Sequence, residues 1–166
     1  TGNLVRKKFF EIGRKKKNAL LLAKKPVIYI TGGSRGSQVI NSAVLGILPR
    51  LLKIARVYHQ TGWIDFQKME GTAQKLARDL RGNYEIKATY SPLEVEGISS
   101  LADIVVSRSG ANTVSELAAS GIPAVLIPIP WSQSGEQEKN AELLQKSGTA
   151  ILLRQEDLTP DKLFFS

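Results

Sequence analysis

The chain lacks cysteine altogether and has a single histidine, His59, among its 166 residues. Without thiols, the protein has no disulfides, thiolate nucleophiles or zinc–cysteine sites. One histidine leaves little from which to build a transition-metal centre, and a histidine-based triad would depend entirely on that residue. The sequence therefore predicts chemistry that uses no bound metal.

Long apolar runs are also absent. No run approaches the roughly 20 apolar residues that a membrane-spanning helix requires, and no signal peptide opens the chain. The sequence begins at Thr1 without an initiator Met and stops inside a predicted helix. This favours a piece of a longer protein, of a length that fits one domain.

Acidic residues are scarce at the start of the chain, where Glu11 alone opposes the basic residues of positions 1–25, and the net charge of the chain is +8. Nucleic acid, an anionic membrane surface or a phosphorylated ligand would each be attracted to such a segment, and a solvated surface without a partner is an equal alternative. Nucleic-acid binding calls for more interleaved aromatics than Phe9 and Phe10, so we expect no such partner. Residues 1–25 are interpreted as a basic leader or interdomain segment, and 26–166 as the domain.

Short β-branched runs alternate with longer helical patterns through the domain. The predicted strands are 27–31, 55–60, 84–90, 103–107, 124–128 and 149–153. Helical spacing of apolar residues follows the first strand, and further helices are predicted near 64–80, 93–101, 113–120, 136–147 and from 160 onward. Strands that are apolar almost throughout are typical of a parallel sheet covered on both faces. The sequence thus predicts an α/β fold, a Rossmann-like doubly wound parallel sheet of about six strands that binds ligands at the carboxyl ends of the strands.

A glycine-rich loop, "TGGSRGSQ" (31–38), follows the first predicted strand. Gly33 permits close backbone approach, Ser34 offers a hydroxyl, and the helix that begins near Ser37 has free N–H groups. The spacing matches neither the dinucleotide fingerprint nor a Walker loop. We expect the loop to bind a phosphate or diphosphate, although a turn selected only for tight strand-to-helix geometry has the same pattern.

A second glycine turn, "SRSGANTVSE" (107–116), follows the fourth predicted strand. Two such turns at one sheet edge favour a shared anion site. Glu116 has two interpretations that the local sequence leaves open. It closes a capping box with Thr113, or its carboxylate accepts hydrogen bonds from a sugar diol.

A long polar loop, "PIPWSQSGEQEKNA" (128–141), follows the fifth predicted strand. The amides of Gln137 and Asn140 suit a hydroxyl-rich ligand such as a sugar, because amides both donate and accept hydrogen bonds. Gln137 also fits a capping box with Ser134, whereas Asn140 has no such explanation. His59, in "YHQTG", has no carboxylate nearby in the sequence to orient it as a base and is left unassigned.

One enzyme family contains these pieces in the same order: "TGNLVR", "GGSRGSQVIN", "HQTG", "ADIVVSRSGANTVSELAASGIPAVLIPIP" and "EQEKNA". Over nearly its whole length the chain resembles the carboxyl-terminal domain of the MurG peptidoglycan glycosyltransferases of family 28. The resemblance implies one half of the two-domain GT-B fold, which binds the donor UDP-GlcNAc without a required metal. The acceptor lipid I would bind an amino-terminal domain missing from this chain. The product would be lipid II, made with inversion on the cytoplasmic side of the membrane by a peripheral enzyme.

The resemblance also implies a set of donor-binding residues: Arg6, Gly33, Ser34, Arg108, Ala111, Thr113, Glu116, Gln137 and Asn140. Among them, Ser34 and Thr113 would approach the phosphates, Glu116 would hold the ribose hydroxyls, and Gln137 with Asn140 would bind the GlcNAc hydroxyls. The uracil-reading segment is expected near residues 90–95. Glu136 departs from the glutamine that is frequent at its position.

No catalytic residue is assigned, because the resemblance places the base in the amino-terminal half. The chain alone is therefore expected to bind the donor weakly and to transfer nothing. A donor-binding subunit of a two-chain enzyme, or a family member with another acceptor, remains an alternative. An NAD-dependent oxidoreductase is disfavoured by the missing fingerprint.

Overall fold

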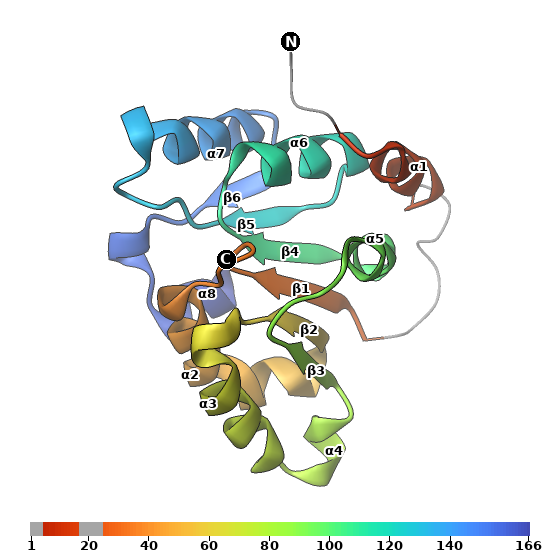
Figure 1. Cartoon of the computed structure of the whole chain (residues 1–166), viewed down its shortest axis with the longest axis vertical. Helices are drawn as coiled ribbons and strands as arrows, with labels where there is room; N and C mark the ends of the chain where they lie inside the picture. The colour runs from red at the N-terminus through yellow and green to blue at the C-terminus, as the bar shows by residue number, and fades with distance from the viewer. Residues whose placement is uncertain (1–4, 17–24) are drawn as a thin grey trace.

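A single six-stranded parallel sheet organises the protein (Figure 1). The computed structural model describes residues 5–16 and 25–166, except for the side chains of 13–16. The strands are β1 (Val27–Thr31), β2 (Arg56–Gln60), β3 (Tyr84–Lys87), β4 (Ile104–Ser107), β5 (Ala124–Leu126) and β6 (Ala150–Leu152). Their order is β3-β2-β1-β4-β5-β6, with every neighbouring pair parallel.

Helices cover both faces of this sheet (Figure 1). The α-helices are α1 (Lys7–Lys16), α2 (Gln38–Ile54), α3 (Trp63–Gln74), α4 (Arg78–Arg81), α5 (Pro92–Leu101), α6 (Ala111–Ser120), α7 (Glu136–Lys146) and α8 (Pro160–Phe165), and the 3-10 turns are η1 (Gln133–Gly135) and η2 (Gln155–Asp157). One face carries α1, α5, α6 and α7, and the other carries α2, α3 and α8. The doubly wound α/β fold predicted from the sequence is confirmed.

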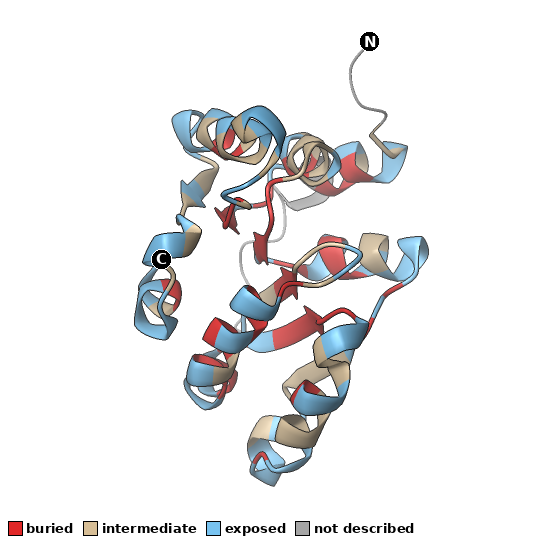
Figure 2. Cartoon of the chain, turned by 60° about the vertical axis from the view of Figure 1, so that its left-hand side comes forward, coloured by how far each residue is buried: buried red, intermediate tan, exposed pale blue. Residues whose placement is uncertain are grey.

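The inner strands β1, β4 and β5 are buried on both faces because successive side chains point into two different cores. Tyr29 and Val105 belong to the core under α5, α6 and α7, whereas their neighbours Ile30 and Val106 belong to the core under α2. Figure 2 shows the buried strands between helices whose outer surfaces are exposed. This double burial explains why strands such as β4 and β5 are apolar almost throughout.

Part of the segment interpreted as a leader or interdomain segment is a helix of the domain itself. α1 packs against α5 and α6. Its Phe9 and Ile12 are each 3% exposed and lie in the same core as Tyr29. The prediction of a leader over 1–25 therefore needs correction for 7–16, since the pair Phe9 and Ile12 gives one helix face an apolar surface to bury. Residues 1–4 and 17–24 lie outside the described residues.

The loop after β1 and the turn after β2 touch backbone to backbone. Gly36 and Gly62 have φ angles of 78° and 75°, in the left-handed region that favours glycine. A Cβ atom on Gly36 would lie 2.1 Å from the carbonyl oxygen of Thr61, and one on Gly62 would lie 2.3 Å from that of Arg35. The contact between the two segments therefore requires glycine on both sides.

Replacing Gly36 with alanine is expected to lower the free energy of unfolding by more than about 2 kcal/mol. A left-handed non-glycine residue costs about 1–2 kcal/mol, and displacement of the Thr61 carbonyl adds to this. The measurement is urea denaturation followed by circular dichroism. Gly71→Ala is the control: Gly71 lies within α3 with nothing within 4 Å of its added Cβ, so we expect a gain of up to about 1 kcal/mol. Equal midpoints for Gly36→Ala and the unchanged chain would contradict the prediction.

Candidate functional site

A cleft of about 540 Å³ lies beside the carboxyl ends of β1 and β4. These two strands are neighbours at the point where the strand order reverses, which is where α/β sheets of this kind bind ligands. Tyr29, Thr31 and Val105 contribute to its wall from the strands. Its size suits a small-molecule ligand.

Five of the nine predicted donor-binding residues line this cleft: Arg6, Gly33, Ser34, Thr113 and Glu116. The two glycine turns, although about 75 residues apart in sequence, both contribute to its wall, as predicted. The other four predicted residues are not among those that line it: Arg108, Ala111, Gln137 and Asn140.

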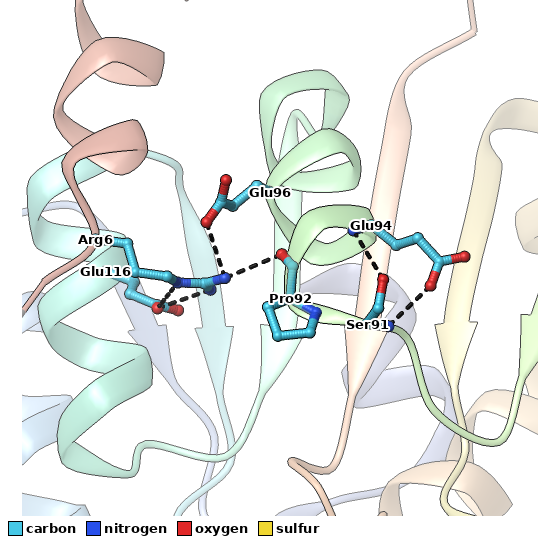
Figure 3. A network of polar contacts seen from close by, with 6 residues as sticks. All are labelled: Arg6, Ser91, Pro92, Glu94, Glu96 and Glu116. Carbon is cyan, nitrogen blue, oxygen red and sulfur yellow. Dashed lines mark hydrogen bonds and ion pairs between the residues drawn. The ribbon is translucent and has the colours of Figure 1, made fainter.

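Arg6 joins α5 to α6 at the cleft (Figure 3). Its Nε and Nη2 atoms donate to Glu116 Oε1 at 3.1 and 2.9 Å. Its Nη1 atom donates to Glu96 Oε1 at 3.1 Å and to the carbonyl oxygen of Pro92 at 3.0 Å. Both bonds to Glu116 end on Oε1, and no described residue donates to Oε2. The carboxylate is thus oriented by Arg6 while one of its oxygens remains available to a ligand.

The capping interpretation of Glu116 is wrong. α6 has Gly110 as its N-cap and begins at Ala111, so Thr113 lies within the first turn and caps nothing. The helix has no side-chain cap, and the N–H groups of its first residues have no partner within the helix. Asn112 and Thr113 of this turn line the cleft. Glu116 is therefore free of a capping role, and an uncapped helix N-terminus borders the cleft.

A real capping box opens α5, at a place where the sequence did not single one out (Figure 3). Ser91 Oγ accepts from the N–H of Glu94 at 3.4 Å, and Glu94 Oε2 accepts from the N–H of Ser91 at 2.8 Å. The box sets Pro92 as the first helical residue. Tyr90, Pro92 and Val95, all within the predicted uracil-reading segment, line the cleft.

Arg108 turns away from the cleft and into the protein. The guanidinium donates to the carbonyl oxygens of Ile127 and Pro128 at 3.0 Å each, to Ser37 Oγ at 2.9 Å and to Gln155 Oε1 at 2.7 Å. The residue is only 9% exposed, and this burial lowers the pKa of its guanidinium. Because Ser37 is the N-cap of α2, Arg108 connects the second glycine turn to the helix that follows the first.

The Asn140 amide and the backbone carbonyl of Gln137 hold α7 against the second glycine turn, whereas the Gln137 side-chain amide contacts the loop after β5. Gln137 Oε1 accepts from the N–H of Ile129 at 3.1 Å, and its carbonyl oxygen accepts from Ser109 Oγ at 2.7 Å. Asn140 Nδ2 donates to the carbonyl oxygen of Ser109 at 3.2 Å. The capping box with Ser134 is wrong, because that residue has a left-handed φ of 52° and α7 has Gly135 as its N-cap.

Four polar residues that the sequence did not single out also line the cleft: Gln60, Thr89, Ser99 and Asn112. The position of Gln60 could have indicated its place in the cleft, because it is the last residue of a predicted strand and ligands bind at the carboxyl edge of the sheet.

His59, left unassigned from the sequence, is a buried and neutral structural residue. Its Nδ1 atom lies 2.9 Å from the Tyr84 hydroxyl and its Nε2 atom 3.0 Å from Asn41 Oδ1. Asn41 Nδ2 donates to the carbonyl oxygen of Thr61 and to Asp65, so its Oδ1 is an acceptor and His59 carries its proton on Nε2. Burial lowers the pKa of His59 to about 3.

Comparison with known proteins identifies the family. The model of the glycosyltransferase family 28 C-terminal domain matches residues 27–165. The chain belongs to glycosyltransferase family 28. Curated relatives from Solibacter usitatus and Treponema denticola are 36% and 37% identical over 99% and 97% of this chain. Each is named UDP-N-acetylglucosamine--N-acetylmuramyl-(pentapeptide) pyrophosphoryl-undecaprenol N-acetylglucosamine transferase.

A comparison with solved structures agrees with the sequence match. The crystal structure of Acinetobacter baumannii MurG aligns with a TM-score of 0.74 and 26% identity over 99% of this chain. The chain spans 43% and 42% of the two curated relatives and 47% of that structure, less than half of each.

Two features are absent from the residues that the structure describes. Within 5–16 and 25–166, no group of three or more His, Cys, Asp or Glu side chains is placed to hold a metal ion. In the same ranges, no helix has the length and apolar character to cross a membrane.

The stability of this family 28 domain is expected to fall in mild acid because of His59. The unfolded histidine has a pKa near 6.5, whereas the folded one has a pKa of about 3. Between these pH values the unfolded chain binds a proton that the folded chain does not. The contribution of neutral His59 to the free energy of unfolding is therefore fully present above about pH 6.5, and it falls by up to about 1.4 kcal/mol per pH unit below that. Urea denaturation at pH 7.5 and 5.0 should show a loss of roughly 2 kcal/mol.

His59→Gln is the matched control for this loss, because His59 is the chain's single histidine and glutamine does not titrate. The variant is expected to show a much flatter profile between pH 7.5 and 5.0. The same pH dependence in both proteins would show that His59 is not its source.

Proposed function

We propose that this chain is the donor-binding domain of an inverting glycosyltransferase that transfers GlcNAc from UDP-GlcNAc to lipid I, forming lipid II in peptidoglycan synthesis. The proposal depends on one observation above all: two glycine turns and Glu116 meet in one cleft at the reversal point of the sheet. The names of the family 28 relatives support the choice of sugar and acceptor.

The nucleoside would lie between α5 and α6. Glu116 Oε2 is proposed to accept hydrogen bonds from the ribose hydroxyls, because Oε1 is already bonded to Arg6. The uracil would contact the segment 90–95, whose Tyr90, Pro92 and Val95 line the same cleft. In this arrangement Arg6 acts on the donor mainly through the carboxylate that it orients.

The diphosphate would lie between the glycine loop and the start of α6. Ser34 borders the cleft on one side and Thr113, in the uncapped first turn of α6, on the other. Free N–H groups and the positive end of the helix dipole stabilise phosphate charge. They would also stabilise the UDP that leaves as the bond to the sugar breaks, so we propose that no metal ion or cofactor is required.

The GlcNAc group is proposed to extend toward α7. Gln137 uses Oε1 to hold Ile129, and its Nε2 donates to no described residue, so a sugar hydroxyl can accept from it. Asn140 lies one turn further along α7. The backbone of Ala111, at the start of α6, would lie near the sugar hydroxyls. Arg108 would support the phosphate region from behind, through the second glycine turn.

The acceptor and the catalytic base are proposed to belong to an amino-terminal domain outside this chain. This division is supported by the curated relatives, because the chain spans less than half of the length of each. The chain alone would then bind the donor without transferring the sugar. Its partners would be UDP-GlcNAc and that acceptor-binding domain, with no nucleic acid.

Calorimetric titration tests the donor site. UDP-GlcNAc and UDP are expected to bind the chain, and NAD is not. Glu116→Ala should weaken UDP binding at least tenfold, because a hydrogen bond to a charged group contributes about 1.5–3 kcal/mol. Glu96→Ala is the matched control: Glu96 also bonds Arg6 but is not among the cleft-lining residues, so a change below about threefold is expected. Tight binding of NAD, or transfer to lipid I by the chain alone, would refute the proposal.

We also propose that α1 attracts the enzyme to the anionic inner surface of the cytoplasmic membrane, as a peripheral protein. While Phe9 and Ile12 face the core, Lys7 and Lys8 are exposed and Phe10 is 51% exposed. Exposed lysines beside an exposed aromatic ring are suited to an anionic lipid surface. Each lysine near such a surface contributes about 1 kcal/mol.

Co-sedimentation with phosphatidylglycerol and phosphatidylcholine vesicles tests this attraction. The chain is expected to bind the anionic vesicles preferentially, and the double variant Lys7→Glu/Lys8→Glu should bind them at least tenfold more weakly. Lys53→Glu/Lys75→Glu, which reverses two exposed lysines away from α1, is the control and should behave as the unchanged chain. Equal binding to both vesicle types would argue against the proposal.

A further inference from the structure

The segment "HQTG" (59–62) contains no predicted donor-binding residue, yet its Gln60 and Gly62 contact the glycine loop. Gly62 contacts the loop backbone at Arg35 and Gly36, as described above. Gln60 precedes this contact, at the end of β2, and is 6% exposed. A polar side chain that is this deeply buried needs hydrogen-bond partners, and those of Gln60 are all around the cleft.

The Gln60 amide connects three segments. Its Nε2 atom donates to the carbonyl oxygen of Gly33 at 3.0 Å and to Thr31 Oγ1 at 3.2 Å. Its Oε1 atom accepts from the N–H of Tyr90 at 3.0 Å. The partners fix the orientation of the amide, because the Gly33 carbonyl can only accept and the Tyr90 N–H can only donate.

Thr31 completes the arrangement on the other side of the same glycine. Its Oγ1 atom accepts from the N–H of Gly33 at 3.0 Å, so both polar backbone groups of Gly33 are bonded to neighbouring side chains. The Gly33 carbonyl also accepts from the N–H of Gly36 at 3.1 Å. Gly33 itself has a φ of 87° and nothing within 4 Å of an added Cβ. Hydrogen bonds, and not side-chain packing, therefore hold this part of the loop.

The peptide between Gly33 and Ser34 shows what these bonds accomplish. A trans peptide is planar, and its carbonyl and N–H point in opposite directions. With the Gly33 carbonyl held toward Gln60, the N–H of Ser34 is directed away from Gln60, toward the exposed side of the loop where Ser34 lies. A loop held in this way presents its donor without reorganisation when an anion arrives.

We infer that Gln60 is a positioning residue for the diphosphate, because it fixes the Gly33–Ser34 peptide of the glycine loop. The inference rests on the proposed function. Gln60 acts through the loop, so its loss affects ligands that contain phosphates and spares those that do not. Uridine and UDP differ in that one respect.

NMR titration of the full chain with uridine and with UDP provides the test. Gln60→Met keeps the length of the side chain without its hydrogen bonds or a new charge. It is expected to weaken UDP binding about tenfold, which corresponds to about 1.4 kcal/mol, and to change uridine binding less than about twofold. The ratio of the two affinities is the readout, because partial unfolding would lower both equally. Gln74→Met, on the exposed end of α3, should leave both affinities unchanged.

Thr31→Val gives an independent second variant, because it removes the hydroxyl that accepts from Gly33 and preserves the shape of the side chain. We expect the same selective loss of UDP binding in Thr31→Val, so this variant tests the inference even if Gln60→Met fails to fold. Equal weakening of uridine and UDP, or unchanged UDP binding in the folded variants, overturns the inference while the proposed function stands. Failure of the unchanged chain to bind UDP overturns the proposed function, and the inference with it.

Discussion

The reversal of strand order between β1 and β4 is the constraint on which the site depends. The connections that leave these adjacent strands run to opposite faces of the sheet, so the chain separates there and leaves space at the carboxyl edge. The cleft, the glycine turns and Glu116 all lie at this separation. In the proposed function, this space, bounded by free N–H groups and one oriented carboxylate, accommodates a nucleoside diphosphate bound to a sugar.

The fold was predictable because the inner strands of the sheet are buried on both faces. Strands such as 104–107 are short apolar runs flanked by helical patterns, and such a run is recognisable even when its first or last residue is placed one position off.

Helix starts were less predictable. Three segments fit the capping-box pattern, at 91–94, 113–116 and 134–137, and only the first forms one. At the other two, Gly110 and Gly135 begin the helix through backbone geometry, which the spacing of side chains does not reveal.

The candidate site was predictable where proximity to a strand end decides the outcome, as at Gly33, Ser34 and Thr113. It was less predictable where the direction of a side chain decides it. Arg108 follows a strand in the same way, yet its guanidinium turns inward to partners between 19 and 71 residues away. The partners of Gln60 are similarly remote, 27 to 30 residues along the chain. Such contacts exist only once the sheet has formed.

Arg108 has a consequence beyond the contacts that hold it. Its partners are carbonyl, hydroxyl and amide oxygens, and no carboxylate among the described residues forms an ion pair with it. The positive charge is thus solvated by dipoles and left uncancelled, between the two turns that border the cleft. Salt screens exposed lysines strongly but a buried charge far less. Arg108 therefore contributes a positive charge beside the two glycine turns that salt screens less than it screens the exposed lysines of α1.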